Sequence, residues 1–166
     1  CWMIGYGIES GSQRVLDLMH KGTTLEQSRR AVALSKEAGL AVTGHCVIGY
    51  PGETEEEVWQ TIKFAIELDL DFAQFYCAVP FPGSPLYEEA LEKGWITRRE
   101  WPRFEQNYSV LDTAELSAQR VMELRRQAYR RFYLRPRLIA RTLSRIRNPR
   151  QAITFTKMVF DFLTWV

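Results

Sequence analysis

Long apolar runs are absent from this sequence of 166 residues. No stretch of about 18 consecutive apolar residues occurs, so the sequence offers no obvious membrane-spanning helix. The first residues also lack the charged segment and apolar core of a secretory signal peptide. Instead, the opening Cys-Trp-Met-Ile is typical of the middle of a strand. We therefore expect a piece of a longer protein, with further sequence upstream.

Cysteine is scarce, and its spacing matches no common metal site. The three cysteines, Cys1, Cys46 and Cys77, are separated by tens of residues, whereas metal-binding cysteines usually occur in closely spaced pairs. Each lies in an apolar, strand-like stretch. We expect three reduced thiols in the core of a cytosolic protein.

Acidic residues are almost missing from one region, although the net charge of the chain is only +2. Residues 120–150 contain eleven arginines and a single acidic residue, Glu123, whereas residues 1–119 contain 10 Lys/Arg and 18 Asp/Glu. The hydrophobic content of 46% is sufficient for one ordinary core. The sequence thus predicts an acidic body followed by a basic arm.

Strand and helix patterns alternate along the first part of the chain. Apolar residues with period two predict strands, and capping residues followed by apolar residues at helical spacing predict helices. The alternation predicts a parallel α/β fold with right-handed crossovers. The predicted strands are 1–9, 40–48 and 72–79, and the predicted helices are 13–20, one that begins at Thr23 or Thr24 and ends at Gly39, one that begins after Thr54, and one between Ser84 and Gly94.

The remainder of the chain is predicted to be mainly helical. We expect a body over residues 1–95, an irregular connection over 96–114 and a helical basic extension over 115–166. Pro136 should break this extension, and a basic helix should follow it over 137–147. That helix has an apolar face and a row of arginines. The face could pack on the body with its arginines over acidic residues, lie on an anionic membrane, or bind nucleic acid.

Unusual turns follow all three predicted strands, and ligands of parallel α/β folds collect at these carboxyl ends. Glu9 places a carboxylate at the first strand end, where it could accept hydrogen bonds from a sugar. Pairing with an arginine or capping a helix is an equal alternative for Glu9. Gly-Tyr-Pro-Gly after the second strand and Pro-Phe-Pro-Gly after the third would form rigid pocket walls.

Three segments in order, GIESGSQRVLDLMHKG, VIGYPGETEEE and FAQFYCAVPFPGSPLYEEA, resemble the second half of a radical S-adenosylmethionine (SAM) barrel. The resemblance implies an α/β fold with three parallel βα units of a six-unit, partial TIM-type barrel. The stretch SAQRVMELRRQAYRRFYLRPR is similar to the tail of the cobalamin-dependent branch, which includes anaerobic magnesium-protoporphyrin cyclases and methyltransferases.

The resemblance implies SAM and a 4Fe-4S cluster as cofactors, with cobalamin as a further candidate. The CxxxCxxC loop that holds such a cluster is not in this sequence, so we expect no metal ligands and no activity from this piece alone. His45 departs from the acidic residue that relatives have at its position. The residues that the resemblance assigns to SAM binding are Glu9, Ser10, Lys21, His45, Val47, Tyr50, Pro51 and Ala78.

The resemblance further implies an enzyme that starts radical chemistry, such as methyl transfer or oxidative cyclisation, on an apolar, tetrapyrrole-like or lipid-like small molecule. Its electron donor would be a flavodoxin or ferredoxin, and its location cytoplasmic, with peripheral membrane contact through the basic arm as an option. Nucleic acid is a less favoured partner, because no base-reading motif accompanies the arginines. The alternatives are a relative of tRNA or protein methylthiotransferases, and a degenerate barrel that acts as a binding module.

Overall fold

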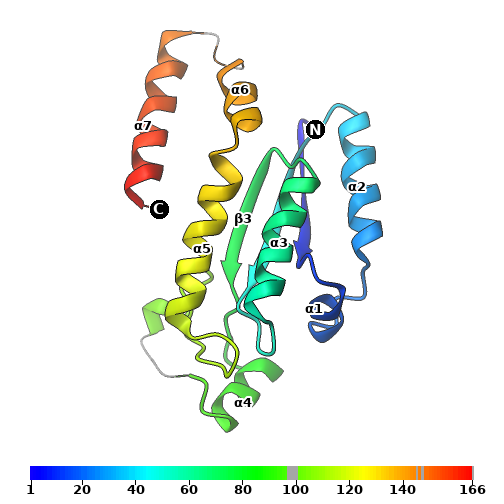
Figure 1. The fold of residues 1–166 in the computed structure, drawn as a ribbon, viewed down its shortest axis with the longest axis vertical. Coiled ribbons are helices and arrows are strands. Elements are labelled where there is room, and N and C mark those ends of the chain that lie inside the picture. Colours follow the sequence, from blue (N-terminus) through cyan, green and yellow to red (C-terminus); the bar gives the residue numbers. More distant parts are fainter. Residues whose placement is uncertain (97–100, 145, 147, 166) are drawn as a thin grey trace.

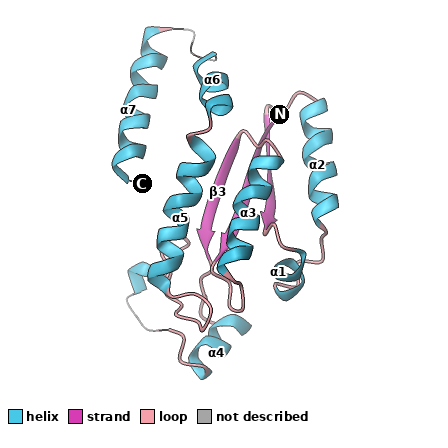
Figure 2. Cartoon of the chain, viewed as in Figure 1, coloured by secondary structure: helices cyan, strands magenta, loops and turns pink. Residues whose placement is uncertain are grey.

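The computed structural model describes the backbone of residues 1–96, 101–144, 146 and 148–165. Three parallel strands form one sheet, in the order β1 (Met3–Glu9), β2 (Ala41–Ile48) and β3 (Phe72–Cys77). The helices that connect them are α1 (Gln13–Leu18), α2 (Leu25–Glu37) and α3 (Glu55–Glu67). Figure 2 shows the strands side by side, with α3 in front of them and α2 to their right. The α/β class predicted from the alternating patterns is confirmed.

Side-chain caps begin the helices at the predicted places. The hydroxyl of Ser12 accepts a hydrogen bond from the first turn of α1. Thr24 and Thr54 form complete capping boxes at the starts of α2 and α3, with Gln27 and Glu57 as the reciprocal partners. Each box satisfies backbone N–H groups that would otherwise be unpaired. The predicted helix starts are therefore confirmed.

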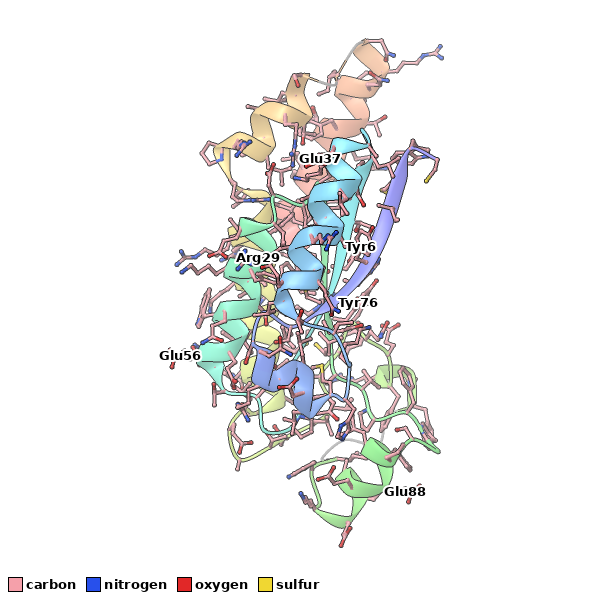
Figure 3. The ribbon with its side chains drawn as sticks, turned by 90° about the vertical axis from the view of Figure 1, so that its right-hand side faces the viewer. Tyr6, Arg29, Glu37, Glu56, Tyr76 and Glu88 are labelled. Atoms are coloured by element: carbon pink, nitrogen blue, oxygen red, sulfur yellow. The ribbon has the colours of Figure 1, made fainter. Side chains whose placement is uncertain are left out.

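The two faces of the sheet differ in their cover. One face packs against α2 and α3, with Val42, Cys46 and Phe75 among its fully buried residues. Figure 3, a side view, shows these helices on one side of the strands. The opposite face, which we call the open face, carries the alternate residues of each strand, and these are partly or fully exposed. Open-face residues include Gly5, Gly7, Glu9, Thr43, His45, Val47, Phe72, Gln74 and Tyr76.

The outer edge of β3 is sealed by side chains of the helix α5 (Ala118–Tyr133). The hydroxyl of Tyr133 accepts from the Ala73 N–H and donates to the Ala73 carbonyl. The Tyr129 hydroxyl accepts from the Phe75 N–H at 3.3 Å, and Arg125 Nε donates to the Phe75 carbonyl at 2.7 Å. These bonds replace the ladder that another strand would form. The sheet therefore ends at β3 on this side.

Between β3 and α5 the chain forms α4 (Pro85–Glu92), a single 3-10 turn at Trp101–Arg103, and irregular segments. After α5 come α6 (Pro136–Ser144) and α7 (Pro149–Trp165). None of the described helices is long and apolar enough to cross a membrane. Sequence analysis predicted the break at Pro136, and the structure places Pro136 at the first position of α6, where its missing N–H costs nothing.

The basic arm packs on the acidic body. Arg141 lies 3.3 Å from Asp69 Oδ2 and 3.7 Å from Asp71 Oδ1, and Arg137 lies 3.8 Å from Asp69. Arg120 at the start of α5 forms hydrogen bonds of 2.9 and 2.7 Å with both carboxylate oxygens of Glu55. Arg137 and Arg141 of the predicted helix 137–147 thus lie over acidic residues of the body, as the packing interpretation predicts, whereas Arg145 of the same row lies outside the described residues.

Candidate functional site

The carboxyl end of β1 places a charged pair over the open face. Glu9 has a left-handed backbone with φ of 59° and ends the strand at a register shift. Its Oε1 accepts a hydrogen bond from Lys21 Nζ at 2.7 Å, and both side chains remain partly exposed. A Cβ on Gly7 would come within 2.7 Å of Glu9 Oε1 and 3.0 Å of Lys21 Nζ. Glycine at this position therefore makes room for the pair.

The ends of β2 and β3 supply aromatic and apolar surface beside that pair. His45 and Tyr76 lie stacked on the open face, with ring centroids 5.9 Å apart and an interplanar angle of 2°. Val47, Tyr50 and Ala78 belong to one small apolar cluster with Ala90 and Leu111. The structure thus brings three of the sequence-predicted SAM residues together in one apolar cluster.

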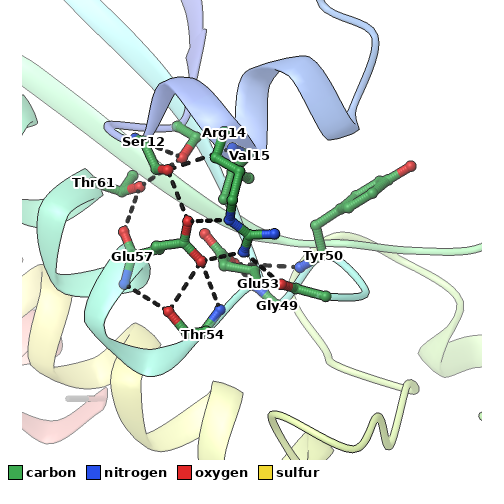
Figure 4. A network of polar contacts seen from close by, with 11 residues as sticks. Ser12, Arg14, Val15, Gly49, Tyr50, Glu53, Thr54, Glu57 and Thr61 are labelled. Carbon is green, nitrogen blue, oxygen red and sulfur yellow. Dashed lines mark hydrogen bonds and ion pairs between the residues drawn. The ribbon is translucent and has the colours of Figure 1, made fainter.

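The turn after β2 is built around a buried carboxyl group. Glu53 is fully buried, and its Oε2 accepts hydrogen bonds from the N–H groups of Gly49 at 2.6 Å and Tyr50 at 3.3 Å (Figure 4). Its Oε1 has no hydrogen-bond partner among the described residues. Burial raises the pKa of Glu53 to about 8, although the two N–H donors act in the opposite direction. Glu53 therefore fixes the turn that carries Tyr50 and the buried Pro51.

A second carboxylate joins the first and second turns, as Figure 4 shows. Glu57 Oε1 accepts from the Ser12 hydroxyl at 2.9 Å and from Arg14 Nε at 2.8 Å. Arg14 also donates to the Gly52 carbonyl at 2.7 Å. The hydrogen bonds from Arg14, followed by those from Thr54 and Ser12, lower the pKa of Glu57 to about 2. This clamp holds α1 against the start of α3 and so fixes the two turns relative to each other.

Ser10 lies apart from the open face. Its side chain is fully buried, and its hydroxyl is 3.1 Å from the hydroxyl of Thr61 on α3. The neighbouring Gly11 approaches α3 so closely that a Cβ there would lie 2.5 Å from the Gln60 carbonyl oxygen. Ser10 therefore anchors the turn after β1, whereas Glu9 faces the space above the sheet.

Metal ligands are not gathered anywhere in the described part of the chain, which contains no group of three His, Cys, Asp or Glu residues suited to a metal ion. Cys46 and Cys77 are buried, and burial raises the pKa of both thiols, that of Cys77 to about 12. Cys1 is exposed, so the expectation of three core thiols is wrong for this one. An iron–sulfur cluster needs thiolate ligands, and the described residues do not fit one.

The carboxyl end of the open face carries a charged pair and, beside it, an apolar cluster. The Glu9–Lys21 pair offers one acceptor and one donor of opposite charge for an amino acid group, and the cluster with Val47, Tyr50 and Ala78 offers an apolar wall. The sequence singled out Glu9 from its place at a strand end, and the family resemblance singled out Lys21, Val47, Tyr50 and Ala78. Sequence reasoning missed the Arg14–Glu57 clamp and the buried Glu53, because neither follows from hydrophobic periodicity. Only Glu57 could have been singled out from the sequence, because it stands at the third helical position of a capping box.

Comparison with known proteins gives consistent matches. The Radical SAM superfamily profile matches residues 1–65. A protein described as an uncharacterized methyltransferase from Pyrococcus horikoshii is 39% identical over 86% of this chain and 31% of its own length. A putative methylthiotransferase from Methanocaldococcus jannaschii is 34% identical over 68% of this chain and 25% of its own length.

A further relative is the anaerobic magnesium-protoporphyrin IX monomethyl ester cyclase of Rubrivivax gelatinosus, which is 33% identical over 54% of this chain and 16% of its own length. The chain therefore spans less than a third of the length of each of these three relatives.

Proposed function

This chain belongs to the radical SAM superfamily, and we propose on that premise that the whole protein is an enzyme that cleaves SAM reductively to begin radical chemistry. The observation that carries the proposal is the Glu9–Lys21 pair held over Gly7 beside the apolar cluster. In this superfamily a 4Fe-4S cluster supplies the electron that splits SAM into methionine and a 5′-deoxyadenosyl radical. The cluster ligands would lie outside this chain.

The residues of this chain would bind and orient SAM rather than transform it. Glu9 would accept hydrogen bonds from SAM, and Lys21 would donate to its carboxylate. Val47 and Ala78 would contact the adenine, and Tyr50, in the turn fixed by Glu53, would exclude water from one side of it. His45, stacked on Tyr76, is the polar side chain nearest in position to the ribose-binding acid of relatives, and it can donate or accept a hydrogen bond.

We favour methyl transfer or oxidative cyclisation on an apolar, tetrapyrrole-like or lipid-like small molecule as the reaction. The support comes from relatives whose names include a methyltransferase and a magnesium-protoporphyrin cyclase. Cobalamin is a candidate second cofactor, and a flavodoxin or ferredoxin a candidate electron donor. Two buried, unpaired cysteines are consistent with a cytoplasmic location.

A methylthiotransferase is the second candidate, because the Methanocaldococcus relative carries that description. Methylthiotransferases resemble this barrel but usually end in a small β domain. The described residues after α4 instead form three helices and no regular strand, which favours the first candidate.

The proposal is tested in the full-length protein by measuring SAM affinity calorimetrically after Glu9→Ala. Loss of one charge-assisted hydrogen bond costs about 1.5–3 kcal/mol, or roughly ten- to a hundredfold in affinity. Glu37→Ala is the matched control, because Glu37 is exposed on α2 far from the open face (Figure 3). Unchanged affinity in Glu9→Ala, with 5′-deoxyadenosine still produced, contradicts the role of Glu9. Absence of SAM cleavage by the intact, reconstituted wild type contradicts the proposed function itself.

A further inference from the structure

A large apolar cavity lies at the opposite end of the sheet from the candidate SAM site. It has a volume of about 590 Å³ and is bounded by the start of β3 and by helices α5, α6 and α7. Figure 1 shows α6 at the amino-terminal end of β3, whereas α4 lies at the carboxyl end. The volume is within the range of small-molecule sites, roughly 300–1,000 Å³. Its lining residues are Asp71, Phe72, Tyr129, Tyr133, Leu134, Leu138, Ile139, Thr142, Leu143, Phe155 and Val159.

The polar side chains in this lining are already committed to partners within the protein. The Tyr129 hydroxyl donates to Gln74, and that of Tyr133 is bonded to both backbone groups of Ala73. Thr142 donates to the Leu138 carbonyl at 2.8 Å. Asp71 accepts from the Val42 N–H at 3.0 Å and faces Arg141. The cavity therefore presents an apolar wall in which hydrogen-bonding capacity is largely used.

Because its wall has few free hydrogen-bonding groups, the cavity suits a hydrocarbon chain better than a peptide. An extended peptide would bury N–H and C=O groups for which the wall has no free partners, and such burial is costly. A hydrocarbon chain has no such groups and gains free energy from every methylene removed from water. Several wall side chains remain more than a third exposed, among them Phe72, Leu134, Ile139 and Leu143. A hydrocarbon occupant would cover surface that now faces water.

The charge near the cavity indicates which group the polar end of a bound hydrocarbon chain would carry. Two of the helices that form its walls, α5 and α6, belong to the basic arm, in which residues 120–150 contain eleven arginines and one glutamate. Arg141 is neutralised by Asp69 and Asp71. Arg137 on the same helix is 84% exposed, and its nearest acid, Asp69 at 3.8 Å, lies closer to Arg141. Arg137 adjoins Leu138 of the lining on α6, so an anionic group at this end of the cavity would be attracted to an exposed guanidinium.

We propose that the cavity between β3, α5, α6 and α7 binds the hydrocarbon chain of a free amphipathic acid, such as a long-chain fatty acid, with its carboxylate beside Arg137. This site is distinct from the candidate SAM site: Phe72, the one open-face residue in its lining, lies at the amino-terminal end of β3, whereas Glu9 lies at the carboxyl end of β1. The inference does not depend on the radical reaction.

The test is titration of delipidated full-length protein with the fluorescent fatty acid cis-parinaric acid. We expect saturable binding that Ile139→Trp weakens at least tenfold, because the larger side chain fills the cavity from α6. Ile153→Trp is the matched control: Ile153 is 70% exposed on α7, outside the lining, and the same substitution there should leave binding unchanged. A second variant, Leu143→Asp, places a charge in the wall and should weaken binding similarly. Circular dichroism verifies the fold of each variant.

Several outcomes would overturn the proposal. They are the absence of saturable binding, equal loss in the Ile139 and Ile153 variants, and retention of affinity in both wall variants. A long-chain alkylamine that binds as tightly as the acid contradicts the role of the arginines. Binding to anionic vesicles without binding of the free acid would identify the surface as a membrane contact. A concentration-dependent dimer that Ile139→Trp dissociates would identify it as an interface between copies of the chain.

Discussion

Glu57 is the residue through which the first two turns of the candidate site are joined. Glu57→Gln removes the charge that Arg14, Thr54 and Ser12 stabilise, and we expect a loss of about 1.5–3 kcal/mol in the free energy of unfolding. The pKa of Glu57 is lowered to about 2 from 4.5, so its contribution is present above pH 4.5. It should disappear as the pH falls toward 2.

Urea unfolding of the full-length protein at several pH values measures this effect. The wild type and Glu57→Gln should differ at pH 7 and converge at low pH. Glu56→Gln, at an exposed neighbouring position, is the control. A difference that stays constant down to pH 2 contradicts the proposed role of the ionised carboxylate.

Glu53 should give the opposite pH dependence. Its pKa is raised by burial from 4.5 to about 8, so the folded state holds the proton more tightly than the unfolded state. This contribution is full below pH 4.5 and is lost as the pH rises toward 8. Glu53→Gln should preserve the fold, because the amide oxygen can still accept from Gly49 and Tyr50, and should flatten the stability profile between pH 5 and 8. Thermal unfolding midpoints check this, and an unchanged profile in the variant counts against it.

Residues at strand ends could be predicted from the sequence, whereas the network behind them could not. Glu9, His45 and Val47 alternate with core residues, so a period-two pattern places them together on the open face. Ser10, the next residue, lies on the covered side beside α3, as the same alternation requires, so its assignment to the SAM site did not follow from the pattern. The Arg14–Glu57 pair joins residues 43 positions apart, and no local pattern reports such a contact.

At the scale of elements, two tyrosines of α5 replace a strand at the edge of β3. Tyr133→Phe removes the hydroxyl that serves both the N–H and the carbonyl of the buried Ala73. Leaving these groups unpaired should cost about 1–3 kcal/mol and speed the hydrogen exchange of the Ala73 amide. Tyr108→Phe is the control, since Tyr108 is exposed outside the interface. Equal exchange at Ala73 in both variants contradicts the sealing role of Tyr133.

The helices beyond residue 118 were predicted with less detail than those of the sheet. The apolar face of α5 and the basic helix after Pro136 follow from helical spacing, and both are found. The seventeen-residue α7 was anticipated only as part of the helical extension over 115–166. Its apolar residues are distributed around the whole helix, so their spacing does not identify one buried side.

At the scale of the whole molecule, this chain by itself should not hold an iron–sulfur cluster. Cys46 and Cys77 are buried with raised thiol pKa values and lie on different strands, and a cluster needs accessible thiolates. Anaerobic reconstitution of the 166-residue chain with iron and sulfide should leave no stoichiometric iron. Full-length protein treated in the same way should acquire iron and cluster absorbance. Stoichiometric iron in the shorter chain contradicts the prediction.

The family was recognised from three strand-end motifs, and the fold class from the order of strands and helices; the comparisons and the structure confirm both. The cavity beside α6 was not predicted, because it depends on how three helices meet around Phe72. A sequence shows which side of a helix is apolar, but not whether the opposing surface fills the space.

The seal on β3 has a consequence for the order of synthesis. Tyr129 and Tyr133 follow the backbone groups that they cover by 54 and 60 residues. A ribosome that adds roughly 5–20 residues per second needs several seconds to produce that interval. Throughout this time the backbone N–H and C=O groups at the outer edge of the newly made β3 are uncovered, and another extended chain could form hydrogen bonds with them. Slow codons or a paused ribosome between residues 77 and 129 should therefore increase misassembly, and a chaperone bound to this interval should suppress it.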